Sequence, residues 1–98
     1  MPRPRKCRRV CTMPRYTSFG PEDGRHGSVQ MMVDEFETVR LIDLEGLTQE
    51  QCADQMDVAR TTVQAIYASA RKKLAECIVG GLTLMIEGGE YRVCEHRN

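Results

Sequence analysis

The stretch TQEQCADQMDVARTTVQAI, residues 48–66, decides the fold because it spaces its residues as a helix-turn-helix does. Two short helices that cross at a tight angle need a small residue where they touch, and Ala53 supplies it. Four residues later the turn must enter the left-handed backbone region, where Asp57 stands in place of the usual glycine and tolerates that region better than most residues. The apolar residues that lock the second helix onto the first follow at the expected offsets: Val58, Val63 and Ile66.

Signals for the start of the first helix and the end of the second lie on either side of this motif. Thr48 and Gln51 form a T-x-x-Q capping box that begins the first helix of the motif. The second helix is predicted from about Arg60 to about Val79, and Gly80-Gly81 ends it. Residues at helical spacing give this helix an apolar face: Val63, Ile66, Tyr67, Ala70, Leu74, Cys77 and Ile78.

A further helix is predicted upstream of the motif. Asp34 is expected to cap it, with Glu37 three residues on completing a capping-box-like pair. Gly46 suits its C-terminal end because glycine adopts a positive φ without strain. Its apolar stripe consists of Phe36, Val39, Ile42 and Leu44, broadened by Val33 and Leu41.

The two flanks of the chain differ from this helical centre. Residues 1–28 hold all four prolines, which forbid a long helix and predict an extended arm with one short strand, Arg8 to Cys11. Segment Ser28–Met32 is weakly strand-like. Two short runs around Gly88-Gly89, residues 82–87 and 90–94, predict a β-hairpin.

The predicted fold class is therefore mainly α, with three parts. Residues 1–28 form the extended basic arm, residues 29–81 the three-helix helix-turn-helix domain, and residues 82–98 the β-hairpin and C-terminal tail. Ninety-eight residues suffice for one modest core. That core must rest on aliphatic residues, since the chain has no Trp and few aromatics.

Charge is clustered although the net charge is zero. Residues 1–15 hold six Lys and Arg and no acid, residues 16–57 hold ten acids against two Arg, and residues 58–79 hold four Lys and Arg against one Glu. Clustering, not net charge, gives a protein its electrostatic footprint for phosphate. The distribution thus favours double-stranded DNA as a partner of the arm and of the second motif helix.

The second motif helix is predicted to enter the major groove. Arg can bind guanine, Gln can bind adenine, and a methyl group can contact thymine, so the expected base contacts are Arg60, Thr61, Gln64 and Ala65. The expected phosphate contacts are Thr62, Arg71, Lys72 and Lys73 on the helix, and Arg3, Arg5, Lys6, Arg8 and Arg9 in the arm. One short recognition helix offers few base contacts, which favours a homodimer.

The five cysteines fall into two groups. Cys52 and Cys77 lie on apolar helix faces and are expected to be buried thiols. If the arm pairs with the C-terminal hairpin, four other residues could form a Cys₃His zinc site; they are Cys7, Cys11, Cys94 and His96. The alternative for these four is free thiols and a flexible tail.

The sequence also bears on classes of function other than DNA binding. No apolar run spans a bilayer and no signal peptide precedes the domain, so the expected compartment is the cytoplasm. No Gly-rich phosphate loop or nucleophile–base pair indicates an enzyme. Two alternatives stay open: a protein-interaction module of the transcription machinery that uses the acidic block 34–57, and a metal or redox sensor that uses Cys7, Cys11 and Cys94.

Three stretches of the chain resemble a family of predicted DNA-binding proteins. They are MPRPRKCRRVC at residues 1–11, VDEFETVRLIDLEGLTQEQCADQMDVARTTVQAIYASARKKLAECIVGG at 33–81, and IEGGEYRVC at 86–94. The family is domain of unknown function 134, or uncharacterised protein family 0251. The resemblance implies a winged-helix-like or sigma-factor region-4-like helix-turn-helix with helices at 48–56 and 60–79. Family members usually have Gly where this chain has Asp57 and Ser where it has Ala59.

Overall fold

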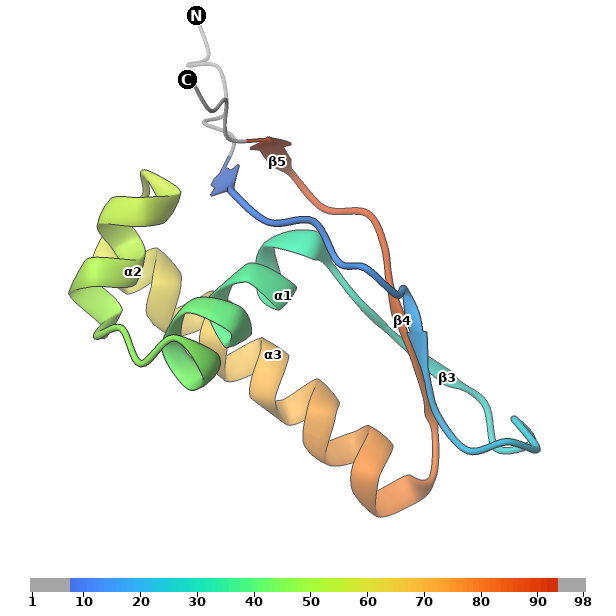
Figure 1. The fold of residues 1–98 in the computed structure, drawn as a ribbon. Coiled ribbons are helices and arrows are strands. Elements are labelled where there is room, and N and C mark those ends of the chain that lie inside the picture. The colour runs from blue at the N-terminus through green and yellow to red at the C-terminus, as the bar shows by residue number, and fades with distance from the viewer. Residues whose placement is uncertain (1–7, 94–98) are drawn as a thin grey trace, which may run out of the picture.

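The computed structural model describes residues 8–93 as three α-helices, a π-helix and five short strands (Figure 1). The mainly α prediction is therefore only partly right, because two small sheets accompany the helices. The helices are α1 (Val33–Thr38), the π-helix η1 (Val39–Leu44), α2 (Gln49–Met56) and α3 (Arg60–Gly80). The strands are β1 (Arg8–Val10), β2 (Ser18–Phe19), β3 (Ser28–Met31), β4 (Thr83–Ile86) and β5 (Tyr91–Val93).

The helix-turn-helix forms as the sequence predicts. Thr48 Oγ1 accepts the N–H of Gln51 at 3.1 Å while the Gln51 side chain accepts the N–H of Thr48 at 2.9 Å, so the capping box begins α2. Asp57 ends α2 in the left-handed region, with φ 61° and ψ 47°. α3 then begins at Arg60 without a side-chain cap, since Ala59 has no polar group to offer.

The start of α1 differs from the prediction. Met32, not Asp34, precedes the first helical residue, and its N–H donates to the Glu35 carboxylate at 2.8 Å. The prediction of an Asp34–Glu37 capping pair is therefore wrong by two residues. The reason is that β3 ends one residue before Met32, so the chain turns into helix earlier than its first acid. Asp34 and Glu37 are instead buried inside α1.

The π-helix η1 continues α1 and alters which side chains reach the core. Its N–H groups bond carbonyls five residues back, which is a wider winding than in an α-helix. As a result Leu41 is 3% exposed and Leu44 is 77% exposed. The predicted placement of Leu44 in the apolar stripe, which assumed α-helical spacing, is wrong.

The two C-terminal strands form where expected but not as a hairpin. β4 lies between β2, antiparallel to it, and β3, parallel to it, whereas β5 pairs in parallel with β1. Gly88 and Gly89 separate the two strands because they pack against the start of α1. The Gly88 carbonyl accepts the N–H of Val33 at 3.0 Å, and a Cβ on Gly89 would come within 2.9 Å of Asp34 Oδ1.

The predicted arm contributes to both sheets over residues 8–28, since it supplies β1 and β2. The strand predicted from Arg8 to Cys11 is confirmed as Arg8–Val10, and the strand-like Ser28–Met32 is confirmed as Ser28–Met31. In Figure 1, β3 and β4 run alongside α3, while α1 and α2 gather toward its N-terminal end.

Two apolar clusters hold these elements together. One lies between the helices and the sheets and contains Val10, Met31, Val33, Ala70, Leu84 and Ile86. The other is the core of the helix-turn-helix and contains Leu41, Cys52, Ala53, Met56 and Val63. Ile78 was expected on the apolar face of α3 but is 81% exposed, because Leu74 and Cys77 occupy the core-facing positions of the last turns. Within residues 8–93, no helix is long and apolar enough to cross a membrane.

Candidate nucleic-acid interface

The four predicted base contacts lie together on one exposed edge of α3. Arg60, Thr61, Gln64 and Ala65, which we call the recognition edge, are all exposed in the first two turns of the helix. Val63 on the opposite side is fully buried and Ile66 is 8% exposed. Packing of Val63 against residues of α2 and η1, together with the burial of Ile66, fixes the rotation of α3 and turns the recognition edge outward.

The recognition edge carries side-chain hydrogen-bonding groups that no other residue within 8–93 binds. Arg60 forms no ion pair or hydrogen bond with another described side chain, and it borders a depression lined by Thr48, Gln49 and Glu50 at the start of α2. Because α2 begins beside this edge, the N-terminal ends of both motif helices face the same side. Free N–H groups at a helix N-terminus favour phosphate oxygens.

The three basic residues at 71–73 have different environments. Lys72 is exposed and forms no hydrogen bond or ion pair with another described side chain. Arg71 donates to the Tyr67 hydroxyl at 2.7 Å, and this hydrogen bond raises the pKa of the guanidinium. The Tyr67 hydroxyl in turn donates to Asp43 Oδ1 at 2.6 Å. Arg71 therefore helps to hold η1 to α3, although its side chain remains 60% exposed.

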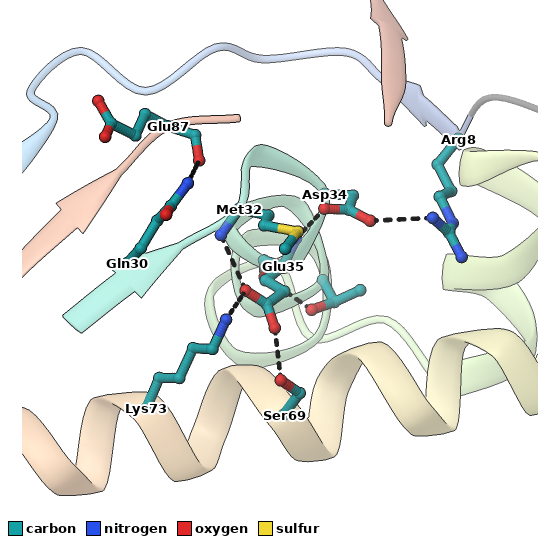
Figure 2. A network of polar contacts seen from close by, with 9 residues as sticks. Arg8, Gln30, Met32, Asp34, Glu35, Ser69, Lys73 and Glu87 are labelled. Atoms are coloured by element: carbon teal, nitrogen blue, oxygen red, sulfur yellow. Dashed lines mark hydrogen bonds and ion pairs between the residues drawn. The ribbon is translucent and has the colours of Figure 1, made fainter. Parts of the chain in front are cut away.

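Lys73 lies in a network of polar contacts that joins α3 to α1 (Figure 2). Its Nζ is 2.7 Å from Glu35 Oε1, and Ser69 Oγ donates to the other oxygen of that carboxylate. Burial would raise the pKa of Glu35, but the hydrogen bonds from Lys73, Ser69 and the Met32 N–H outweigh burial and lower it. Lys73 is thus half-buried and paired within the fold, and its predicted phosphate contact stays a prediction.

The arm residues that the structure describes also bind other parts of the chain. Arg8 Nη1 is 3.5 Å from Asp34 Oδ2 (Figure 2), and burial raises the pKa of Asp34 although Arg8 opposes this. Arg9 donates to two backbone carbonyls at the end of α2. The other predicted arm contacts, Arg3, Arg5 and Lys6, lie outside the described residues. Thr62 is half-buried beside the recognition edge.

The acidic block 34–57 offers less open surface than the sequence suggests. Asp34, Glu35 and Glu37 are 4%, 6% and 1% exposed. Glu37 accepts two hydrogen bonds from Arg40, both at 2.9 Å, and one from the Cys11 N–H at 3.0 Å. All three acids of α1 therefore serve the interior, while the other five acids of the block are exposed or half-buried.

The cysteines support the prediction of buried thiols more clearly than the prediction of a metal. Cys52 is fully buried, and burial raises its pKa to about 11. Cys77 is half-buried against the sheet cluster, and burial raises its pKa as well. The pairing of arm and C-terminal strand on which the zinc site depends is present as β1–β5. Of its four ligands only Cys11 is described, since Cys7, Cys94 and His96 lie outside the described residues.

No group of three His, Cys, Asp or Glu suited to a metal occurs within residues 8–93, so the zinc site stays a prediction.

Arg92 was not among the predicted site residues. Its side chain lies 2.9 Å from the Asp57 carboxylate, in the turn before the recognition edge. No sequence signal marked this contact, because it depends on the parallel pairing of β5 with β1.

Comparison with known proteins gives a family without a stated activity. The family model described as "Protein of unknown function DUF134" matches residues 1–94. A UPF0251 protein of Desulfitobacterium hafniense (strain Y51) is 62% identical over 98 residues, covering 97% of this chain and 78% of the relative. A UPF0251 protein of Caldicellulosiruptor bescii is 52% identical over 91 residues, covering 93% of this chain and 65% of the relative. No solved structure matches. The chain therefore belongs to the DUF134 family, and the two relatives described above are named UPF0251 proteins.

Proposed function

We propose that this protein is a sequence-specific DNA-binding transcription regulator of the cytoplasm. The observation that carries the proposal is the recognition edge: four exposed residues at the start of α3, directly after a turn with helix-turn-helix geometry. In this class of motif the N-terminal part of the second helix enters the major groove and contacts base edges. Arg60 and Gln64 offer bidentate contacts to guanine and adenine, and the Ala65 methyl offers an apolar contact to thymine.

Charge on α3 fits the same orientation. The exposed side of the first two turns of α3 holds no acid, although Glu50 of α2 lies beside Arg60. Lys72 follows Gln64 by eight residues, about 12 Å along the helix, where a side chain would leave the groove and reach a phosphate. We therefore assign Lys72 as the principal phosphate contact of α3. Arg71 is a second contact whose position is set by Tyr67 and Asp43.

We place DNA binding ahead of a protein-interaction module because of where the acids lie. A basic partner would need open carboxylates, and most of the eight in the block are already used within the fold. Asp34, Glu35 and Glu37 are buried. The more exposed acids include three that pair with arginines, namely Asp43 with Arg71, Glu45 with Arg40 and Asp57 with Arg92. A homodimer remains part of the proposal. A single recognition edge of four residues offers few base contacts, and a symmetric pair doubles them.

Selection of bound sequences from a random pool of DNA duplexes tests this function. We expect enrichment of a short motif, and a mobility shift with that motif that persists at physiological salt while scrambled duplex is released. Binding of all duplexes alike, with a steep salt dependence, would indicate a nonspecific DNA-binding protein. An absence of any shift at low salt would reject DNA binding altogether.

A further inference from the structure

The two strands at the ends of the described chain form a sheet that touches the helix-turn-helix. β1 and β5 pair in parallel with Arg8 opposite Tyr91, Arg9 opposite Arg92, and Val10 opposite Val93. We call this pair the terminal sheet; it lies beside the end of α2 (Figure 1). Of the two arginines that are paired across it, Arg9 reaches the last turn of α2 and Arg92 reaches the turn that follows α2.

Arg9 binds the C-terminal end of α2. Its Nε donates to the Gln55 carbonyl at 2.7 Å, and its Nη2 donates to the Asp54 carbonyl at 3.1 Å. The last carbonyls of a helix lack intrahelical partners and carry the negative end of the helix dipole. The Arg9 guanidinium binds the Gln55 carbonyl and shares the Asp54 carbonyl with the Asp57 N–H, and its planar shape lets one side chain contact both carbonyls.

Arg92 binds the turn residue itself. Its Nη2 donates to Asp57 Oδ2 at 2.9 Å. Asp57 is the one residue other than glycine with a positive φ in the part of the chain that the structure describes. A side chain strains the backbone in this conformation, so contacts from elsewhere must hold it there. The ion pair to Arg92 is such a contact, because it joins the aspartate side chain to a separate sheet.

We propose that Arg9 and Arg92 are positioning residues for DNA recognition: the terminal sheet holds the α2–α3 turn so that α3 presents its recognition edge. The inference rests on the proposed function. α3 begins at Arg60, only three residues after Asp57, so any change in the conformation of that turn alters the direction of α3. The proposal also changes the role of Arg9, which the sequence predicts as a phosphate contact.

Salt dependence separates these two roles of Arg9. A phosphate contact contributes about 0.9 to the slope of log affinity against log salt concentration, whereas a positioning residue contributes nothing to that slope. We expect Arg9→Ala to reduce discrimination between the selected and a scrambled duplex about tenfold with the slope unchanged. A slope smaller by about one with discrimination intact would show that Arg9 contacts phosphate and would overturn its positioning role.

Arg25→Ala is the matched control. Arg25 lies in the exposed loop before β3, where its backbone N–H donates to Asp23 Oδ1, and its replacement by alanine removes the same charge. It should change neither discrimination nor turn stability. Arg9→Lys adds a second comparison, since lysine keeps the charge but cannot span both carbonyls; it should behave as Arg9→Ala does.

Hydrogen exchange in the free protein tests, without DNA, whether Arg9 and Arg92 stabilise the turn between α2 and α3. The amide N–H groups of Asp57 and Val58 bond carbonyls at the end of α2. They should exchange about tenfold faster in Arg9→Ala, and about threefold faster in Arg92→Ala because the Arg92–Asp57 pair is solvent-exposed, while amides in the middle of α3 keep their rates. Unchanged exchange at these two amides would overturn the proposal. If the wild-type protein binds no duplex, the proposed function fails. The exchange measurement still decides whether Arg9 and Arg92 stabilise the turn.

A rescue experiment distinguishes Arg92 from a general stabilising contact. Glycine adopts a positive φ without strain, so the turn no longer needs anchoring in an Asp57→Gly background. We expect Asp57→Gly to restore normal exchange and discrimination to Arg92→Ala, and to leave Arg9→Ala impaired. Failure of the rescue would mean that Arg92 acts by another route and would overturn its role.

Discussion

Lys73 Nζ lies 2.7 Å from Glu35 Oε1, and this ion pair ties the middle of α3 to the first turn of α1. The side chains are 23% and 7% exposed, so the pair is shielded from water on the carboxylate side. Lys72, the preceding residue, is exposed and free of such a partner among the described side chains. Two adjacent lysines therefore have different roles, one in the fold and one at the surface.

Paired substitutions should separate these roles. Lys73→Ala leaves the buried Glu35 carboxylate with two hydrogen bonds and no counter-charge, so we expect a loss of about 1–3 kcal/mol in the free energy of unfolding. Lys72→Ala should change stability by less than about 0.5 kcal/mol. It should weaken binding to all duplexes alike and reduce the salt slope by about 0.9. Urea unfolding and mobility shifts measure the two effects, and equal stability losses for both variants would contradict this assignment.

The same ion pair predicts how stability depends on pH. The pKa of Glu35 is lowered from its usual 4.5 in the folded state, so the unfolded state takes up protons first on acidification. Glu35 thus contributes stability above about pH 4.5, and this contribution is lost as pH falls through its lowered pKa. Glu35→Gln should be less stable than the wild type at pH 7, and the difference should shrink on acidification toward pH 3.

Asp34→Asn is the control with the opposite sign. Burial raises the pKa of Asp34 from 3.8, so its stabilising contribution exists below that value and is lost as pH rises through the raised pKa. The asparagine variant should therefore lose more stability than the wild type on acidification. Unfolding midpoints measured from pH 3 to pH 7 would check both variants. Parallel curves for the wild type and Glu35→Gln would show that the Lys73 contact does not perturb Glu35.

Local sequence signals predicted the helix-turn-helix almost to the residue. The capping box at Thr48, the small Ala53 and the turn at Asp57 each depend on contacts within about ten positions of the chain. Such contacts follow from spacing alone, so the bounds of α2 and α3 could be derived without a structure. The recognition edge followed for the same reason, since it is the side of α3 opposite Val63 and Ile66.

Contacts between distant segments could not be predicted in this way. Gly88-Gly89 between two short strands is a normal hairpin signal, but Gly88 binds Val33 and β5 pairs with β1 instead. The pairing partner of a strand depends on which edge the fold leaves open, and spacing does not encode this. The intramolecular partners of Arg9 could not be predicted for a related reason, because they lie 45 and 46 positions away in the chain. The π-helix shifted Leu44 because its winding breaks the 3.6-residue period.

Cys52 should be the slower of the two described helical thiols to react. Burial raises its pKa to about 11 from a usual 9.0, so about a hundredfold less thiolate is present at pH 8 than for an exposed cysteine. Its Sγ also lies 3.7 Å from Met56 Sδ inside the helix-turn-helix core. Iodoacetamide labelling followed by peptide mass spectrometry should modify Cys77 first, and Cys52 only under conditions that unfold the core. Rapid modification of Cys52 in the native protein would indicate that α2 opens readily.

Arg60→Ala should change sequence preference more than affinity for DNA in general. Arg60 has no structural partner among the described side chains, so its loss should leave the unfolding midpoint unchanged. A bidentate contact from arginine to guanine discriminates against other bases by about 1–3 kcal/mol. Selection from a random pool should therefore give the wild-type motif with one position relaxed, while affinity for scrambled duplex falls only slightly. Lys72→Ala is the comparison, because it should weaken every duplex and relax no position. If Arg60→Ala instead weakened selected and scrambled duplexes equally, Arg60 would be a phosphate contact, and the base contacts of α3 would have to begin at Thr61 or Gln64.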